Sequence, residues 1–191
     1  MTGEAVQAIV IGASAGAIQA LSSILPELPA DYPIPVLVVV HIPADRADLL
    51  APLFQARCRL VVKEAEDKEP ILPGLIYFGA SDYHLLVESD RSVSLSVDEP
   101  VLYSRPSIDV LFESAADAYG PALVGVILTG ANEDGAEGLR AVAEAGGVTL
   151  VEDPAEAFAP VMPSAALARC AAARSMSLDA ISAYLVSLGR S

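Results

Sequence analysis

The stretch Ala8-Ile-Val-Ile-Gly12-Ala-Ser14-Ala-Gly16 decides the expected fold, because a short apolar run ends in Gly-x-Ser-x-Gly and a helix-forming run follows. This order predicts a strand over residues 7–11 and a helix over residues 17–25, joined by a tight turn that exposes the serine. The free N–H groups at the start of that helix would face anything bound there. By itself, such a turn suits either a nucleophilic serine or a phosphate-binding loop.

Beyond this turn, short apolar runs alternate with helical segments. Residues 36–40 and 123–128 are apolar without polar alternation, which is typical of strands buried on both faces of a sheet. We therefore expect an α/β fold, a three-layer αβα sandwich around a mostly parallel, Rossmann-like sheet. Short runs near residues 75–78, 85–88 and 93–96 predict an antiparallel hairpin region at one edge of the sheet.

The remaining elements complete one predicted domain over residues 1–191, a length that allows a sizeable core. Asp45 is the predicted N-cap of a helix that Pro52 would break or kink. The further predicted strands cover residues 60–62 and 148–151, and the helices cover residues 45–56, 108–118, 135–144, 164–172 and 178–188.

Composition excludes several classes of function. The net charge of −14 repels nucleic acid and acidic membranes, and the chain has no Trp and only 5% aromatic residues with which to stack bases. No uncharged stretch is long enough for a membrane span, and no cation precedes the first apolar run because the first Lys or Arg is Arg46. Cys58 and Cys170 are isolated in the sequence, so we expect free thiols and a cytoplasmic location.

Three polar residues follow predicted strands, at the edge where open α/β sheets bind ligands. Ser14 follows the first strand, His41 follows the strand 36–40 directly, and Asp134 lies in the loop after the strand 123–128. A serine, a histidine and an aspartate that meet there could act as nucleophile, general base and orienting acid.

Each of these residues also has a simpler explanation. Ser14 could be a small residue in a tight turn, His41 a loop histidine, and Asp134 the cap of the helix that starts at Gly135. His84 is the rival base, but it lies in the hairpin region, where a structural or substrate-edge role fits better.

Two other kinds of site fit the sequence less well. A metal site at Glu133, Asp134 and Glu137 lacks a histidine at ligand spacing, and a solvated acidic loop explains this cluster. A dinucleotide site needs Gly-x-Gly-x-x-Gly and an acid after the second strand. Here Ser14 and Ala17 replace two of those glycines and His41 stands in place of the acid, which favours nucleophilic chemistry.

In this order the motifs resemble the catalytic domain of the CheB protein-glutamate methylesterases. The matching blocks extend over nearly the whole chain, and several motifs in one order are more specific than any one of them. They are Ile11-Gly-Ala-Ser-Ala-Gly-Ala17, Val40-His-Ile-Pro43, Val62-Lys-Glu-Ala-Glu-Asp67 with Leu72-Pro-Gly74, Arg105-Pro-Ser-Ile-Asp-Val-Leu-Phe112, Gly125-Val-Ile-Leu-Thr-Gly130 and Asp134-Gly135.

The resemblance implies a serine hydrolase that cleaves glutamyl methyl esters on the cytoplasmic domains of chemoreceptors, in chemotaxis adaptation, and that also deamidates particular glutamines. It assigns Ser14 as nucleophile, His41 as base and Asp134 as acid, and implies neither a cofactor nor a metal. The backbone amides of Ala131 and Ala15 are the expected oxyanion donors. Family members usually carry a methionine at the first of these two positions.

Several departures from the family pattern raise alternatives. Ala15 and Ala17 stand where Thr and Gly are usual, and typical members carry a phosphorylated receiver domain before the catalytic domain. We expect this chain to act without one in cis, so a separate regulatory protein becomes a candidate partner. The alternatives are a non-catalytic CheB-like interaction module and, less favoured, a nucleotide-binding α/β protein. The −14 charge also disfavours docking on acidic receptor helices, so the sequence requires either a different partner or a locally neutral patch.

Overall fold

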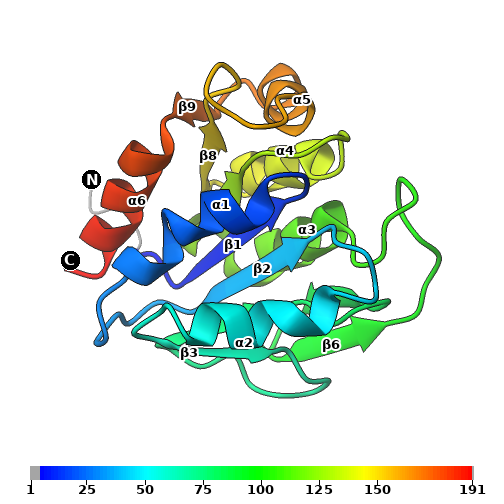
Figure 1. The fold of residues 1–191 in the computed structure, drawn as a ribbon, viewed down its shortest axis with the longest axis vertical. Coiled ribbons are helices and arrows are strands. Elements are labelled where there is room, and N and C mark those ends of the chain that lie inside the picture. The colour runs from blue at the N-terminus through cyan, green and yellow to red at the C-terminus, as the bar shows by residue number, and fades with distance from the viewer. Residues whose placement is uncertain (1–4, 191) are drawn as a thin grey trace.

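The structure, a computed structural model, describes residues 5–190 and is built around a seven-stranded sheet with helices on both faces (Figure 1). All of the strand pairings in this sheet are parallel. The strands, in spatial order, are β3 (Val61–Glu64), β4 (Leu75–Phe78), β2 (Val36–Val40), β1 (Ala8–Ala13), β7 (Leu123–Ile127), β8 (Val148–Glu152) and β9 (Arg174–Met176). This arrangement confirms the predicted α/β fold class.

The central strand β1 is buried along its whole length, and its side chains alternate between two separate hydrophobic cores. Ile9 and Ile11 belong to the core beneath α1 (Ala17–Ser22), α2 (Leu50–Gln55) and α6 (Leu178–Leu188). Ala8 and Val10 belong to the core beneath α3 (Ile108–Tyr119), α4 (Ala136–Glu144) and α5 (Val161–Arg169). A strand covered on both faces needs apolar residues at every position, which explains its unbroken apolar sequence.

The antiparallel hairpin consists of β5 (His84–Val87) and β6 (Val93–Ser96), which form a small sheet of their own. This hairpin packs against α3, where Leu85, Val87 and Val93 join the same core as Phe112. The prediction of an antiparallel hairpin is confirmed, but the hairpin does not extend an edge of the main sheet as expected, and the prediction that Leu75–Phe78 belongs to it is wrong. That segment is β4, a parallel strand between β2 and β3, and a loop without a helix connects β3 to it.

Two predicted helices are shorter than expected, and one strand was missed. The helix after Ser14 ends at Ser22, and Pro26 lies inside a 3-10 turn, Leu25–Glu27. Asp45 does not cap a helix, because a 3-10 turn at Ala47–Leu49 precedes α2. Pro52 therefore lies in the first turn of α2, where its missing N–H group costs nothing. The edge strand β9 is only three residues long, too short to leave a clear periodic pattern.

The order of the strands in the sheet indicates where the candidate site lies. Strand β1 pairs with β2 on one side and with β7 on the other, so the chain reverses its direction of winding at β1. Ligands bind in open α/β sheets at the carboxyl ends of the strands beside such a reversal. Within residues 5–190, no helix is both long enough and apolar enough to cross a bilayer.

Helices α3 and α4 approach each other closely at Gly138. A Cβ atom at this position would lie 2.7 Å from the Phe112 Cβ atom and 3.0 Å from the Asp109 Cα atom. Alanine has the higher helix propensity, worth about 1 kcal/mol, but the contact involves backbone atoms that cannot move independently. This glycine therefore sets the distance between the two helices.

We predict that Gly138→Ala lowers the free energy of unfolding by about 1–3 kcal/mol, because overpacking outweighs helix propensity. Urea denaturation would measure this change. Arg140→Ala, on the exposed side of α4, is the control and should change stability by less than about 1 kcal/mol. A Gly138→Ala protein as stable as the wild type would contradict the prediction.

Candidate active site

Strand register brings Ser14 and His41 to the same edge of the sheet. Ala13 of β1 pairs with Val40 of β2, so Ser14 and His41 are each the first residue beyond this pair. The His41 backbone N–H group donates to the Ala13 carbonyl at 3.0 Å, which extends the pairing by one more hydrogen bond. Neighbouring strands lie about 4.8 Å apart, so the two residues are direct neighbours across the sheet.

A tight turn carries Ser14 from β1 into α1. The Ala17 N–H group donates to the Ser14 carbonyl at 2.9 Å, and Gly16 has φ 84° and ψ 6°. These values match the third residue of a type II turn, a position that favours glycine. The side chain of Phe158 covers Gly16 so closely that a Cβ atom there would lie 2.9 Å from the Phe158 Cβ atom. Gly16 is thus required both by its backbone conformation and by the space available.

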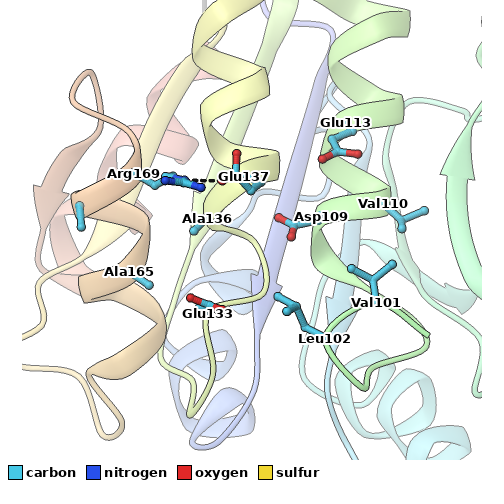
Figure 2. A pocket seen from close by; sticks show the side chains of 11 residues that line it. Val101, Leu102, Asp109, Val110, Glu113, Glu133, Ala136, Glu137, Ala165 and Arg169 are labelled. Atoms are coloured by element: carbon cyan, nitrogen blue, oxygen red, sulfur yellow. Dashed lines mark hydrogen bonds and ion pairs between the residues drawn. The ribbon is translucent and has the colours of Figure 1, made fainter. Parts of the chain in front are cut away.

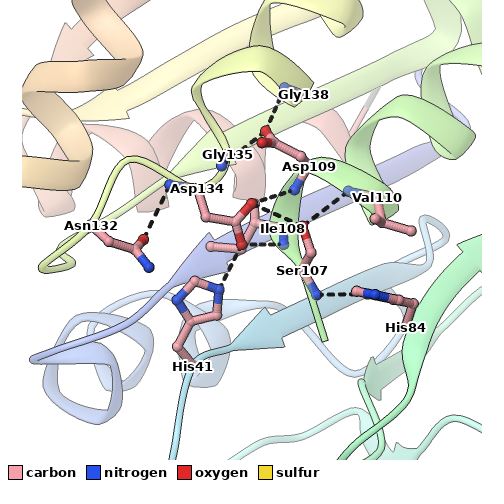
Figure 3. Close-up of polar contacts among 10 residues, drawn as sticks. All are labelled: His41, His84, Ser107, Ile108, Asp109, Val110, Asn132, Asp134, Gly135 and Gly138. Atoms are coloured by element: carbon pink, nitrogen blue, oxygen red, sulfur yellow. Dashed lines mark hydrogen bonds and ion pairs between the residues drawn. The ribbon is translucent and has the colours of Figure 1, made fainter. Parts of the chain in front are cut away.

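The His41 ring is held by Asp134, with 2.6 Å between the Nε2 atom and the Oδ2 atom (Figure 3). A carboxylate can only accept hydrogen bonds, so in the neutral ring the proton is on Nε2 and Nδ1 is free to accept one. In the usual Ser-His-Asp arrangement the aspartate binds Nδ1 and the serine faces Nε2. In this site Asp134 binds Nε2 instead, which leaves Nδ1 without a partner among the described residues.

Asp134 is fully buried, and the first turn of α3 surrounds its carboxylate with donors (Figure 3). The Ile108 N–H group donates to Oδ2 at 2.7 Å, and the Asp109 N–H group donates to Oδ1 at 3.0 Å. The hydroxyl of Ser107, the N-cap of α3, donates to Oδ1 at 2.9 Å. With His41 as the fourth donor, the negative charge lies at the positive end of the helix dipole.

Asp109, in the first turn of α3, binds α4 in return. Its Oδ1 atom accepts from the N–H groups of Gly135 at 2.9 Å and Gly138 at 2.7 Å. Asp134 just before α4 therefore holds the start of α3, while Asp109 holds the start of α4. The sequence-based alternative that Asp134 caps its own following helix is wrong, because Asp109 supplies that cap.

The pKa values of the two carboxyl groups are shifted in opposite directions. Burial by itself would raise the pKa of Asp134, but the hydrogen bonds from His41 and from the Asp109 and Ile108 N–H groups outweigh it and lower the pKa. Burial raises the pKa of Asp109 to about 7, and the charge of Asp134 adds to this effect against the donors Gly138 and Gly135.

Asp109 also lines an acidic cavity of about 630 Å³ between α3, α4 and α5 (Figure 2). Glu113 and Glu133 line the same cavity, together with Glu137, which forms an ion pair with Arg169. Burial raises the pKa of Glu113, and the charges of Glu137 and Asp117 raise it further. The negative charge thus gathers on the side of Asp109 that faces away from the His41 ring.

His84 has a structural role, as the sequence indicated. It is buried, its Nδ1 atom accepts from the Ser107 N–H group at 3.1 Å, and its Nε2 atom contacts the Glu99 carbonyl at 2.9 Å. A ring that accepts at Nδ1 and donates at Nε2 is neutral and fixed in one tautomer. His84 therefore holds the residue before α3 in place and has no nitrogen left to serve as a base.

Ser14 and His41 line one cavity of about 660 Å³, together with Ala15, Gly16 and Phe158. Within residues 5–190, the Ser14 hydroxyl makes no hydrogen bond, with His41 or any other group. In unliganded enzymes such catalytic hydrogen bonds are often long and tighten when substrate binds. Of the predicted oxyanion donors, Ala15 lies at this cavity, whereas Ala131 is exposed and is not among the described residues that line it.

Sequence reasoning missed two buried residues that support the serine turn. The Thr129 hydroxyl donates to the Ala15 carbonyl at 2.8 Å, and the Thr129 N–H group donates to Oε2 of Glu152 at 2.8 Å. Burial raises the pKa of Glu152 against the lowering effect of this N–H group. Both residues are polar and lie at or just beyond the ends of apolar strands, the same signal that singled out His41.

Three comparisons with known proteins point to one family. The sequence profile described as CheB methylesterase matches residues 9–185. A Leptospira interrogans protein, "Putative protein-glutamate methylesterase/protein-glutamine glutaminase", is 44% identical over 182 residues, which cover 95% of this chain and 94% of that protein. The crystal structure of the Thermotoga maritima CheB methylesterase catalytic domain has a TM-score of 0.89 and 30% identity, and the match covers 97% of this chain and 100% of that one.

Other relatives are longer than this chain. A Bordetella parapertussis protein-glutamate methylesterase/protein-glutamine glutaminase is 41% identical over 178 residues, which cover 91% of this chain but 51% of that protein. A Myxococcus xanthus relative with the same activities in its name, number 5, is 41% identical, and 46% of it is covered. The chain thus spans about half the length of these two relatives and nearly all of the Leptospira protein.

We predict that Asp134→Asn destabilises the protein by about 3 kcal/mol, because an amide has one acceptor oxygen for four donors and turns its NH₂ group toward some of them. Asp109→Asn is the matched control. Only Oδ1 of Asp109 accepts hydrogen bonds from the described residues, and an amide oxygen can accept both of them. Denaturant unfolding at neutral pH would compare the two variants, and equal losses of stability would contradict this account.

A second prediction concerns pH. Since folding raises the pKa of Asp109 to about 7, the folded protein binds a proton that the unfolded chain releases near pH 4. This group therefore lowers the free energy of unfolding as the pH rises from about 4 to 7. We expect Asp109→Asn to lose less stability than the wild type across that range, in thermal unfolding at several pH values. Parallel pH profiles for both proteins would refute the assignment.

Proposed function

Since this chain belongs to the CheB methylesterase family, we propose that it is a serine hydrolase that cleaves glutamyl methyl esters on proteins and releases methanol. The observation that carries the proposal is the hydrogen bond between His41 and Asp134 at the strand end next to Ser14. The names of the relatives support this substrate class, and they add deamidation of protein glutamine as a second activity of the same site. We propose the cytoplasmic domains of methyl-accepting chemoreceptors as substrates, and the cytoplasm as the location.

In the proposed mechanism, the Ser14 hydroxyl attacks the ester carbonyl and its proton passes to Nδ1 of His41. The imidazolium is stabilised by the Asp134 carboxylate, which stays ionised because its pKa is low. When the tetrahedral intermediate collapses, His41 returns the proton to the leaving oxygen and methanol departs. Water then attacks the acyl-serine, gives its proton to His41 in the same way, and releases the free glutamate and Ser14.

Oxyanion stabilisation is proposed to come from backbone N–H groups. The Ala15 amide lies in the turn directly after the nucleophile and at the same cavity, so it is the first candidate. Ala131 remains a second candidate through movement of the loop before Asp134, since that residue is exposed in the structure. Removing one such donor typically lowers the rate about 10²–10³-fold, so each one contributes measurably.

A non-catalytic role is the second candidate, favoured by one observation. The Ser14 hydroxyl makes no hydrogen bond to His41 or to any other residue of the range 5–190, so the nucleophile is not held in an activated position. A binding module would keep the fold without turnover. Labelling of Ser14 by a serine-directed fluorophosphonate separates the two, because only an activated serine reacts with it.

We predict that Ser14→Ala lowers methanol release from a methyl-esterified chemoreceptor fragment by about 10³-fold or more. The Tm should remain close to that of the wild type, because the Ser14 hydroxyl makes no hydrogen bond to the described residues. Headspace methanol analysis measures the activity, and circular dichroism checks the fold. Equal methanol release by the variant and the wild type would sink the assignment of Ser14 as nucleophile.

A further inference from the structure

Two cavities share His41 as a lining residue. One is the cavity with Ser14 and Phe158, and the other, of about 330 Å³, is lined by Ile42, Tyr103 and Pro106 among others. Both include Val40 and His41, so a continuous surface runs from Phe158 past the His41 ring to Tyr103. Among the described residues that line these two cavities none is acidic, although the chain holds 25 Asp and Glu residues.

Tyr103 stands at the tip of a two-residue turn and lines the same cavity as His41, and the residue is fully exposed, at 102%. Val101 and Ser104 close the turn with two hydrogen bonds, 3.0 Å from the Val101 N–H group to the Ser104 carbonyl and 2.9 Å in the reverse direction. Leu102 and Tyr103 between them have φ values of 49° and 64°. Positive φ at both central residues is the pattern of a type I′ turn.

The two central residues of this turn are unfavourable for the stability of the protein. Type I′ turns favour Asn-Gly, because bulky L-residues are strained in the left-handed conformation. Leu102 lines the acidic cavity of Figure 2, whereas Tyr103 is fully exposed. Strained residues that pack against nothing are found where a side chain must be presented to another molecule.

Hydrogen bonds of Arg105 fix the chain directly after the turn 101–104. Arg105 donates to Oδ1 of Asp82 from Nε at 3.0 Å and from Nη2 at 2.7 Å, and its Nη1 atom donates to the Val97 carbonyl at 2.9 Å. The buried His84 ring contacts the Glu99 carbonyl, so this segment is also tied to the residue before α3. Tyr103 is therefore presented at a fixed place beside the candidate base rather than on a loose loop.

We propose that Tyr103 is a specificity residue that contacts an apolar patch of the protein substrate next to the esterified glutamate; this rests on the proposed function. The acid-free surface past His41 would let a protein of net charge −14 approach an acidic partner without direct repulsion at the site. An aromatic ring supplies contact area at low entropic cost, so one exposed tyrosine is an effective anchor. A small ester would not reach it.

The test uses the double variant Leu102→Asn/Tyr103→Gly, which gives the turn the residues that it favours. We expect the Tm to rise by about 3 °C, while the kcat/KM for a methyl-esterified chemoreceptor fragment, divided by that for p-nitrophenyl acetate, falls roughly tenfold. Tyr103→Phe should keep that ratio within about twofold, because the ring remains. Leu72→Asn is the control for a partly exposed apolar side chain on the loop that leads into β4.

The outcomes separate this inference from the proposed function. A wild-type protein that hydrolyses neither substrate would overturn the proposed function, and the inference with it. An active wild type whose ratio is unchanged in the double variant would overturn the inference alone, as would equal losses on both substrates. A Tm that does not rise would show that the turn is unstrained, and would remove the argument that Tyr103 is kept for contact.

Discussion

The fold and the candidate site both depend on one set of reciprocal hydrogen bonds, in which two carboxylates each accept from the first turn of the neighbouring helix. Asp134 precedes α4 and accepts from the first N–H groups of α3, while Asp109 in α3 accepts from the first N–H groups of α4. Each helix start leaves N–H groups without partners inside the helix, and here each is satisfied by a side chain attached to the other. Any shift of one helix therefore breaks hydrogen bonds at both.

These hydrogen bonds also explain how a fully buried carboxylate can stay charged. Removing Asp134 from water disfavours its ionised form, yet four donors and the α3 dipole surround it. Asp109 has two donors and a negative neighbour, so burial dominates there and its pKa is raised. Two aspartates in similar burial thus divide into an ionised partner for the His41 ring and a group that titrates near neutral pH, according to the number of donors around each.

The sequence predicts the parts of the molecule whose pattern is local. Residues 36–40 form a strand as expected, because an unbroken apolar run suits only a strand covered on both faces. The sequence pattern could not predict that Leu75–Phe78 enters the main sheet, because a four-residue apolar run looks the same in a hairpin and in a parallel strand. Asp109 was overlooked for a different reason. Its carboxylate is buried by contacts with α4, some 26 residues away in the chain, which no local pattern records.

Strand order brings Ser14, His41 and Asp134 together from three neighbouring strands, with Asp134 bound at Nε2 of the ring. Ser14 follows β1, the strand adjacent to β2, so it is a neighbour of the His41 backbone across the sheet. Asp134 comes from the loop after β7, two strands from β2, and it binds the ring at Nε2, the nitrogen farther from the backbone. With Nε2 bound to Asp134, Nδ1 is the ring nitrogen left to serve as the base in the proposed mechanism, and the α3 dipole stabilises the charged partner of Nε2.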